Sequence, residues 1–273
     1  MTASSFDPSG LDAQLIPLAL DLADAAGEVI RPLFRGELHA EYKPAASPIV
    51  TIADRQAEQR MRQILSERVP HHGVIGEEFG RKEADSPYTW VLDPLDGTIG
   101  FSTGKPLFGT LIALLLEDQP ILGIIDQPIW RERWLGIRGR VTTYNGQPVQ
   151  SKANRDLRKA YLSTTSPDLF ATPDQKRYLH QLRQVVSVTS FGGDCYQYGL
   201  LALGCLDVIL ERSLALYDFA ALIPVIEGAG GVITDWQGSP LHQGSPGEVL
   251  ATANPQLHQQ VLQLWSASPV EEI

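Results

Sequence analysis

The segment Thr89-Trp90-Val91-Leu92-Asp93-Pro94-Leu95-Asp96-Gly97-Thr98 places two carboxylates directly behind a short apolar run. Apolar runs of this length that end at Pro and Gly are typical of buried strands, so 89–92 predicts a strand and 93–98 the loop after it. In layered folds of helices and sheets, binding and catalytic residues commonly lie on loops outside the carboxyl ends of strands. Asp93 and Asp96 are therefore candidate site residues, although Asp-Pro and Asp-Gly are just as common as simple turn formers.

Helical and extended patterns surround this segment in the first half of the chain. Apolar residues at helical spacing predict one helix over 11–33 and a second that begins near Asp54. Helices followed by strands that turn residues join into hairpins indicate an α+β first half. The expected strands lie at 89–92, 108–116, 121–125 and 133–137.

The rhythm changes after a stretch of turn residues at about 145–155. Strand and helix candidates then alternate, which is typical of an α/β unit with a mostly parallel sheet. We expect an α+β domain over 1–150 and an α/β domain over 151–273. The expected strands of the second half lie at 160–164, 185–189, 206–210, 231–234 and 249–251, and the helices near 174–184, 194–204, 218–228 and 255–266.

Composition narrows the class of protein. The 273 residues are 43% apolar and 20% charged, which is enough to bury a substantial core. A net charge of -10 argues against a nucleic-acid or anionic-membrane partner, because such surfaces need clustered Lys and Arg. On a chain this acidic, a phosphate group would need cations to bind.

Nothing in the sequence predicts export or membrane insertion. The first ten residues lack the basic and apolar regions of a signal peptide, and no apolar run approaches the length of a membrane span. Cys195 and Cys205 are expected on one helix and its exit, both buried and reduced. We therefore expect a cytoplasmic protein.

Two further acidic motifs match the loop at 93–98 in character. These are Gly76-Glu77-Glu78-Phe79-Gly80 and Asp218-Phe219-Ala220-Ala221. Alone, Glu77 reads as a solvated loop carboxylate, and Asp218 reads best as a helix N-cap. Together with Asp93 and Asp96 they offer an all-oxygen donor set without a His or Cys cluster, which favours Mg²⁺ over Zn²⁺.

Motifs of several other catalytic sites are missing from the sequence. It contains no Walker A motif, no G-x-G-x-x-G, no G-x-S-x-G and no H-E-x-x-H. The loop at 93–98 is similar to the D-x-D-G-T loop of haloacid-dehalogenase phosphatases. Its two Asp residues are one position further apart, however, and this spacing would misplace the second carboxylate.

Four separated motifs together resemble the inositol monophosphatase family over nearly the whole chain. The resemblance implies a layered αβαβα sandwich of the sugar-phosphatase type, an α+β and α/β fold. Two departures are Tyr217 in place of the usual Trp and Pro48 in place of an acidic residue, which would weaken an auxiliary metal site. The matching motifs are D-P-[IL]-D-G-T at 93–98, G-E-E at 76–78, W-D-x-A at 217–220 and V-T-x-x-D at 50–54, with Lys43 upstream.

Within that family, the histidinol-phosphate phosphatase branch is the most similar. The runs that carry this resemblance are 101–114, 123–128, 193–196 and 224–231. It implies hydrolysis of histidinol phosphate in histidine biosynthesis. An inositol monophosphatase or a broader sugar or nucleotide phosphatase is the alternative, and a non-catalytic binding protein is a remote one.

The family resemblance also assigns roles to individual residues. Glu77, Asp93 and the Leu95 carbonyl would hold one Mg²⁺, and Asp93, Asp96 and Asp218 a second, with a third ion reached through water from Glu77. Thr98, together with Glu77 or Asp54, would activate the attacking water. The substrate contacts would be Asp96, Gly97, Thr98, Gly192, Gly193, Asp194, Glu211 and Asp218.

The assignments of Asp194 and Glu211 as substrate contacts each have a structural alternative. Asp194 could equally cap the helix behind Gly192-Gly193, whereas Glu211 ends a predicted strand. Two carboxylates suit an ammonium and an imidazole better than a neutral polyol. The family's habit suggests a homodimer.

Overall fold

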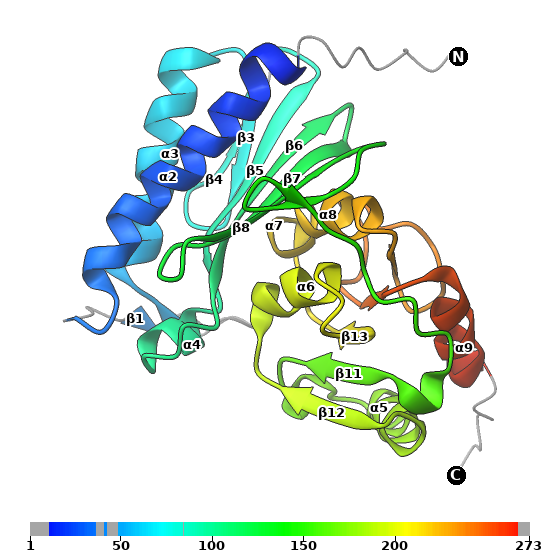
Figure 1. Ribbon diagram of the computed structural model, residues 1–273. Coiled ribbons are helices and arrows are strands. Elements are labelled where there is room, and N and C mark those ends of the chain that lie inside the picture. The colour runs from blue at the N-terminus through cyan, green and yellow to red at the C-terminus, as the bar shows by residue number, and fades with distance from the viewer. Residues whose placement is uncertain (1–10, 37–40, 43–48, 84, 267–273) are drawn as a thin grey trace.

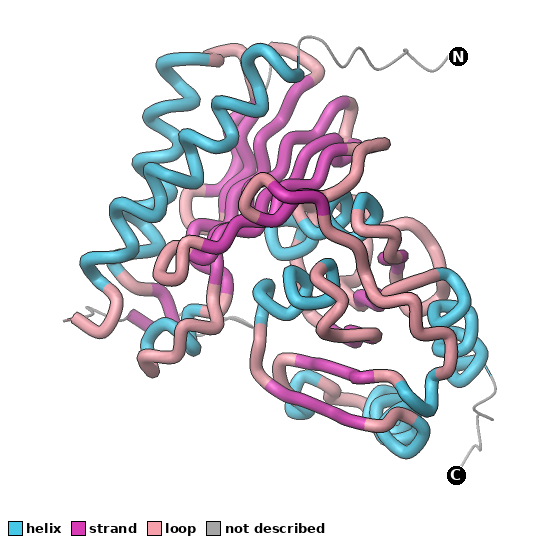
Figure 2. Tube along the Cα trace, in the orientation of Figure 1, coloured by secondary structure: helices cyan, strands magenta, loops and turns pink. Residues whose placement is uncertain are grey.

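The computed structural model describes residues 11–36, 41–42, 49–83 and 85–266. Figure 1 shows helices and sheets in alternating layers, and Figure 2 shows the same trace by type of structure. Mixed sheets flanked by helices form the layered α+β fold that the sequence predicted. Lys43 and Pro48 lie outside the described residues.

Two long helices form the first layer. The predicted helix over 11–33 is confirmed as a π-helical turn, η1 (Leu11–Leu15), followed by α2 (Ile16–Leu33), and the second as α3 (Ile52–Arg68). Their apolar stripes are buried against the large sheet. Thr51 and Asp54 cap the start of α3, because Ala53 N donates to Thr51 Oγ1 and Thr51 N donates to Asp54 Oδ2.

The large sheet has the order β10-β9-β8-β7-β6-β5-β3-β4. Its strand β5 (Tyr88–Asp96) runs antiparallel to β6 (Gly109–Leu116) and parallel to β3 (Gly73–Gly76). The expected loop at 93–98 is therefore partly strand. Its pairing is interrupted between Asp93 and Asp96, where Pro94 has no N–H to donate. The remaining strands are β4 (Gly80–Lys82), β7 (Gln119–Gln127), β8 (Glu132–Ile137), β9 (Thr143–Tyr144) and β10 (Gln147–Pro148).

The second sheet has the order β12-β11-β13-β15-β14. The prediction of a mostly parallel sheet is correct for β12, β11 and β13 but wrong for β15 (Val249–Thr252), which runs antiparallel to both of its neighbours. The connection at 235–248 contains no helix, and a parallel crossover normally requires one. The other strands are β11 (Tyr161–Thr164), β12 (Val188–Phe191), β13 (Val208–Glu211) and β14 (Val232–Thr234). The helices α5 (Pro173–Val185) and α9 (Pro255–Ser266) pack on this sheet's outer core.

Short helices fill the layer between the two sheets (Figure 1). These are α6 (Asp194–Ala202), α7 (Leu216–Phe219) and α8 (Leu222–Gly228). The single helix expected over 218–228 is thus two helices. Pro224, near the start of α8, has no N–H with which to continue the ladder of α7.

A shared core joins the two halves of the chain. One buried cluster contains Val91 and Leu111 from the large sheet together with Phe219 and Val225 from α7 and α8. The division into domains 1–150 and 151–273 remains a prediction. The other short elements are β1 (Glu41–Tyr42) with β2 (Ile49–Val50), α4 (Thr98–Ser102), η2 (Leu157–Lys159) and η3 (Pro167–Leu169).

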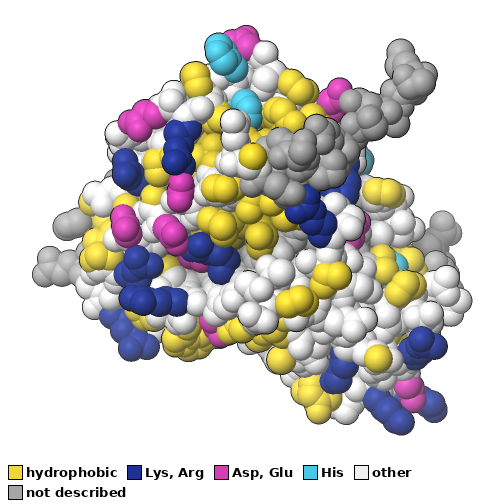
Figure 3. Space-filling view, turned by 45° about the horizontal axis from the view of Figure 1, so that its top comes forward, with side chains coloured by type: hydrophobic (Ala, Val, Ile, Leu, Met, Phe, Trp, Pro, Cys, Tyr) yellow, Lys and Arg dark blue, Asp and Glu magenta, His cyan; other side chains and the backbone are white. Residues whose placement is uncertain are grey.

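The surface and the two cysteines bear on three of the expectations. On the face in Figure 3, Lys and Arg side chains lie beside Asp and Glu, without a continuous basic patch among the described residues. No described helix has the length and apolar character needed to cross a membrane. Both cysteines are free, but Cys205 is exposed, contrary to expectation, because it follows the turn that ends α6.

Candidate active site

Three carboxylates from distant parts of the sequence meet between the sheets. One oxygen each of Asp93, Asp96 and Asp218 lies within 4.8 Å of the others. Asp93 and Asp96 come from the irregular end of β5, and Asp218 comes from α7. Glu77 follows the neighbouring strand β3 and lines the same cavity of about 420 Å³ as Asp96 and Asp218.

Local hydrogen bonds fix the loop that carries Asp93. Asp93 Oδ1 accepts from Leu95 N at 3.0 Å, and Thr110 Oγ1 donates to the Pro94 carbonyl at 2.8 Å. Asp96 Oδ2 accepts from Cys195 N at the start of α6. The turn-forming interpretation of Asp93 thus holds beside the metal-binding one, because its carboxylate shapes the loop and also has an oxygen near those of Asp96 and Asp218.

Asp218 is not the N-cap of its helix. It is the third residue of α7, where its Oδ2 accepts from Ala215 N at 2.6 Å. The bond satisfies one free N–H of the first turn. The carboxylate is thereby held toward Asp93 and Asp96.

The electrostatics of the cluster favour a bound cation. Burial raises the pKa of Asp96 and of Asp218 to about 7, and it raises the pKa of Asp93 well above its usual range. The neighbouring carboxylates add to each shift, because like charges disfavour further ionisation. A buried, all-oxygen cluster of this kind fits a hard divalent ion such as Mg²⁺, whose charge would offset both costs.

Thr98 and Asp54 meet beside this cluster. Thr98 Oγ1 lies 3.2 Å from Asp54 Oδ1 and 3.1 Å from the Leu95 carbonyl, and its one proton can serve either acceptor. The other Asp54 oxygen accepts from Thr51 Oγ1 at 2.6 Å. Both side chains are almost fully buried. The structure therefore places a hydroxyl and a carboxylate in contact where the sequence predicted them to act on water.

The short helix α4 (Thr98–Ser102) begins at the same point. Its N-cap, Gly97, has φ +88°, a conformation that favours glycine. A Cβ there would also lie 3.0 Å from the Leu107 carbonyl and 3.1 Å from Asp194 Cβ. Gly97 thus lets the carboxylate loop, α4 and the start of α6 converge.

Two more carboxylates, Asp194 and Glu211, line the same cavity. Glu211 ends β13 and is buried, and its Oε1 accepts from Thr165 N and, at 2.9 Å, from Gln197 Nε2. Asp194 opens α6, but Gly193 is the N-cap and no side chain caps this helix, so the capping interpretation of Asp194 is wrong. Burial raises the pKa of Glu211 to about 7 and that of Asp194 to about 8. Gly192 and Gly193 precede α6 without lining the cavity.

Sequence comparison connects this geometry with known proteins. A profile of the inositol monophosphatase family matches residues 12–269. The chain belongs to the inositol monophosphatase family. It is therefore a phosphatase, and the enzymes of this family depend on metal ions, generally Mg²⁺.

The names of the individual relatives refer to different substrates. The phosphatase is 49% identical over 251 residues to the bifunctional phosphatase IMPL2, chloroplastic, of Arabidopsis thaliana, a match that covers 89% of this chain and 72% of that protein. It is 35% identical to a histidinol-phosphatase of Chlorobaculum parvum, over 88% and 92% of the two chains. A solved structure of an inositol monophosphatase from Zymomonas mobilis superposes with a TM-score of 0.85 at 44% identity, over 94% and 99% of the chains.

Glu58 supports the site of the phosphatase and was not predicted from the sequence. Glu58 on α3 is fully buried, and its carboxylate accepts from Glu78 N at 2.7 Å and Phe79 N at 3.2 Å. It thereby holds the chain directly after Glu77. A Cβ on Gly76 would lie 2.0 Å from Glu58 Oε1, so the glycine of the G-E-E motif leaves room for this contact. A Glu beside the apolar positions of α3 was the only signal.

Sequence analysis also missed Gln197 and Tyr198, which line the cavity from α6. Tyr198 is fully buried close to Glu211 and Asp96, whose charges, together with burial, raise its pKa. Gln197 holds Glu211 through the hydrogen bond from its Nε2. Neither residue belongs to a motif that the sequence singles out, because only the docking of α6 on the second sheet brings them to the site.

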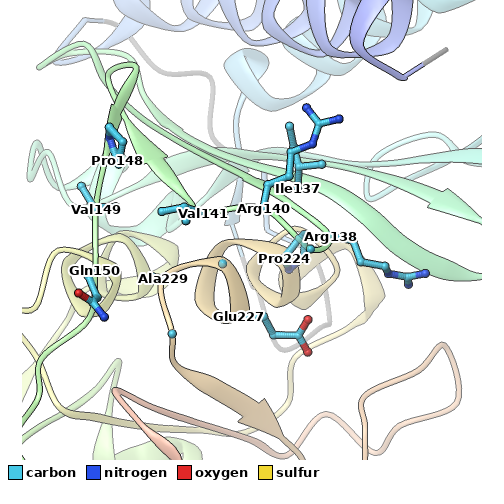
Figure 4. Close-up of a pocket in the computed structure, with 13 residues that line it drawn as sticks. Ile137, Arg138, Arg140, Val141, Pro148, Val149, Gln150, Pro224, Glu227 and Ala229 are labelled. Carbon is cyan, nitrogen blue, oxygen red and sulfur yellow. The ribbon is translucent and has the colours of Figure 1, made fainter. Parts of the chain in front are cut away.

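A larger cavity of about 750 Å³ lies elsewhere, between the β8–β10 edge and α8 (Figure 4). Glu227 is the only carboxylate among its lining residues. In Figure 4, Arg138 and Arg140 extend from the strand side, and Glu227 lies on the helix side. One carboxylate cannot replace the five that line the smaller cavity, so size does not identify the active site here.

Proposed function

We propose that this phosphatase hydrolyses histidinol phosphate to histidinol and phosphate, using Mg²⁺ and a water molecule. The observation that carries the proposal is the pair Asp194 and Glu211, two carboxylates, the second of them buried, that line the cavity beside the metal cluster. Ammonium and imidazole groups would satisfy them as charge-assisted hydrogen-bond donors. The histidinol-phosphatase name of the Chlorobaculum parvum relative supports the same choice.

The metal ligands in this proposal are Glu77, Asp93 and the Leu95 carbonyl for one ion, and Asp93, Asp96 and Asp218 for another. Asp93 is then shared, and a third ion would contact Glu77 through water. Two bound Mg²⁺ ions would stabilise charge on the phosphoryl group and lower the pKa of water. The proximity of the Asp93, Asp96 and Asp218 oxygens supports the shared arrangement.

The remaining residues position the reactants. Thr98 would orient the attacking water and pass its proton toward Asp54 or Glu77, and the hydroxyl already contacts Asp54. The backbone N–H groups of Gly97 and Thr98, at the start of α4, would bind phosphoryl oxygens.

We also propose that the protein is a cytoplasmic homodimer. Sedimentation of the purified protein would test its oligomeric state.

A phosphate-release assay across several monoesters tests the substrate. Histidinol phosphate, inositol monophosphates, fructose bisphosphate and adenosine 3',5'-bisphosphate are compared at saturating Mg²⁺. We expect the highest kcat/KM with histidinol phosphate. A higher value with an inositol monophosphate would favour the second candidate, which the Zymomonas mobilis neighbour supports. No release from any monoester would favour a binding protein.

A further inference from the structure

A second charged pocket lies between α2 and the turn that joins β7 to β8. Its volume is about 510 Å³, and it shares no lining residue with the carboxylate cavity. We call it the arginine pocket. Its charged lining residues are Asp24, Arg31, Asp126, Arg131 and Arg133.

Arg133 pairs with both aspartates of the pocket. Arg133 Nε donates to Asp126 Oδ1 at 2.6 Å, and Nη2 donates to Asp24 Oδ1 at 2.7 Å. Asp126 is nearly fully buried, so this contact is needed to keep its charge in the fold. Three guanidinium groups against two carboxylates leave one net positive charge, on a chain whose net charge is -10.

Arg31 reaches the pocket across a glycine. A Cβ on Gly27, inside α2, would lie 2.7 Å from Arg31 Nη1 and 3.2 Å from Pro128 Cβ. Glycine within a helix costs about 1 kcal/mol relative to alanine. Here its missing side chain lets the guanidinium lie along the helix beside Pro128, a residue of the pocket wall. Arg31 also acts on Asp126 through space and lowers that carboxyl's pKa against the rise caused by burial.

Arg131 enters from the other side, on a rigid turn. Gln127 Oε1 accepts from Ile129 N and Trp130 N, both at 2.8 Å, which holds the residues that precede Arg131. Arg31 and Arg131 are both exposed, and neither forms an ion pair within the described part of the chain. Two guanidinium groups on separate, fixed elements are thus available to a ligand.

We propose that the arginine pocket binds a phosphoryl dianion, free or carried by a small metabolite. Guanidinium groups match the oxygens of a phosphoryl group with paired, charge-assisted N–H donors. Asn145 and Thr143 add polar atoms to the wall. The site is separate from the catalytic one, and its existence does not depend on which monoester the enzyme hydrolyses.

Calorimetric titration with inorganic phosphate tests the proposal on the full chain in excess EDTA. Without cations the catalytic carboxylates repel phosphate, so binding under these conditions reports a different site. We expect one phosphate per chain and about tenfold weaker binding for Arg31→Gln and for Arg131→Gln. Arg81→Gln, which removes an arginine paired with Glu83 outside the pocket, should bind phosphate like the wild type.

Two results would overturn the proposal. One is no phosphate binding by the wild type in EDTA, and the other is unchanged binding by both variants. Activity of the variants on p-nitrophenyl phosphate with Mg²⁺ should stay at the wild-type level, which shows that they fold. That assay uses the catalytic site alone, so failure of the histidinol assignment would leave this test unaffected.

Discussion

Thr98 is the residue at which water activation and metal binding can be separated. Its hydroxyl contacts Asp54 and the Leu95 carbonyl. The three clustered carboxylates Asp93, Asp96 and Asp218 are instead held by backbone N–H groups of other residues. A variant at this position should therefore lose one function and keep the other.

Thr98→Ala should lower kcat by on the order of 10² to 10⁴, the range for loss of a positioned proton-transfer group. The affinity for Mg²⁺ should stay close to that of the wild type. Phosphate-release kinetics and a calorimetric Mg²⁺ titration measure the two effects. Thr103→Ala removes an exposed hydroxyl at the far end of α4 and is the matched control. A Thr98→Ala enzyme with normal kcat would exclude the water-relay role.

Asp194→Ala and Glu211→Gln test the proposed contacts with the cationic end of the substrate. Each should reduce transition-state stabilisation for histidinol phosphate by roughly 2 to 5 kcal/mol, because a cationic partner loses its carboxylate. The loss with p-nitrophenyl phosphate, which offers no cation, should be much smaller. Asp174→Ala, which replaces an exposed aspartate paired with Arg177, serves as the control. Equal losses on both substrates would show that these carboxylates only support the structure.

Sequence could predict the carboxylates that meet in the site but not the residues that hold them. Asp93, Asp96 and Asp218 stand in motifs whose order along the chain is itself informative. Glu58 and Gln197 act through hydrogen bonds to other elements, and no spacing in the sequence encodes those contacts. Their roles depend on how α3 and α6 dock.

At the scale of elements, the junction between β3 and Glu77 depends on the space at Gly76. Gly76→Ala would push its new Cβ into the Glu58 carboxylate. We expect a loss of about 1 to 3 kcal/mol in unfolding free energy from this overpacking, together with weaker Mg²⁺ binding because Glu77 shifts. Thermal unfolding and Mg²⁺ titration measure both.

Gly139→Ala is the matched control for this prediction. A Cβ on Gly139 would meet open space, but the φ of this residue is +76°, so alanine there brings backbone strain without a steric clash. Its Mg²⁺ affinity should be unchanged even if stability falls. Normal Mg²⁺ affinity in Gly76→Ala would refute the link between Glu58 and the metal ligand.

Element types were predictable where the apolar residues of an element form a helical stripe or a continuous run. The helices α2 and α3 and the strands β5, β6, β7 and β8 of the large sheet were predicted from their apolar patterns, whereas its short strands β3, β4, β9 and β10 were not. The antiparallel direction of β15 and the break between α7 and α8 were not predictable in this way. Both depend on the path that the chain takes between elements, and the spacing of apolar residues carries no information about that path.

At the scale of the whole molecule, the buried carboxylates couple stability to pH. The pKa values of Asp96, Asp218 and Glu211 are about 7 and that of Asp194 is about 8, all above those of the unfolded chain. The folded state therefore binds more protons than the unfolded state up to about pH 8, and stability must fall as pH rises through this range.

The metal-free enzyme should thus lose thermal stability between about pH 6.5 and about pH 8.5, and Mg²⁺ should remove the part of that loss that comes from its proposed ligands Asp96 and Asp218. This pH range excludes the effect of His258. Burial lowers the pKa of His258 to about 4, so its titration changes stability only below about pH 6.5. Tm is measured across the window in EDTA and in Mg²⁺. A Tm in EDTA that stays level or rises with pH would contradict the electrostatic description of the site.

The central claim is that the carboxylates at Glu77, Asp93, Asp96 and Asp218 act by holding Mg²⁺. Phosphate release from histidinol phosphate, measured in excess EDTA and again after Mg²⁺ is restored, tests it most directly. We predict no activity above background in EDTA and full recovery with Mg²⁺. Undiminished phosphate release in excess EDTA would contradict the claim.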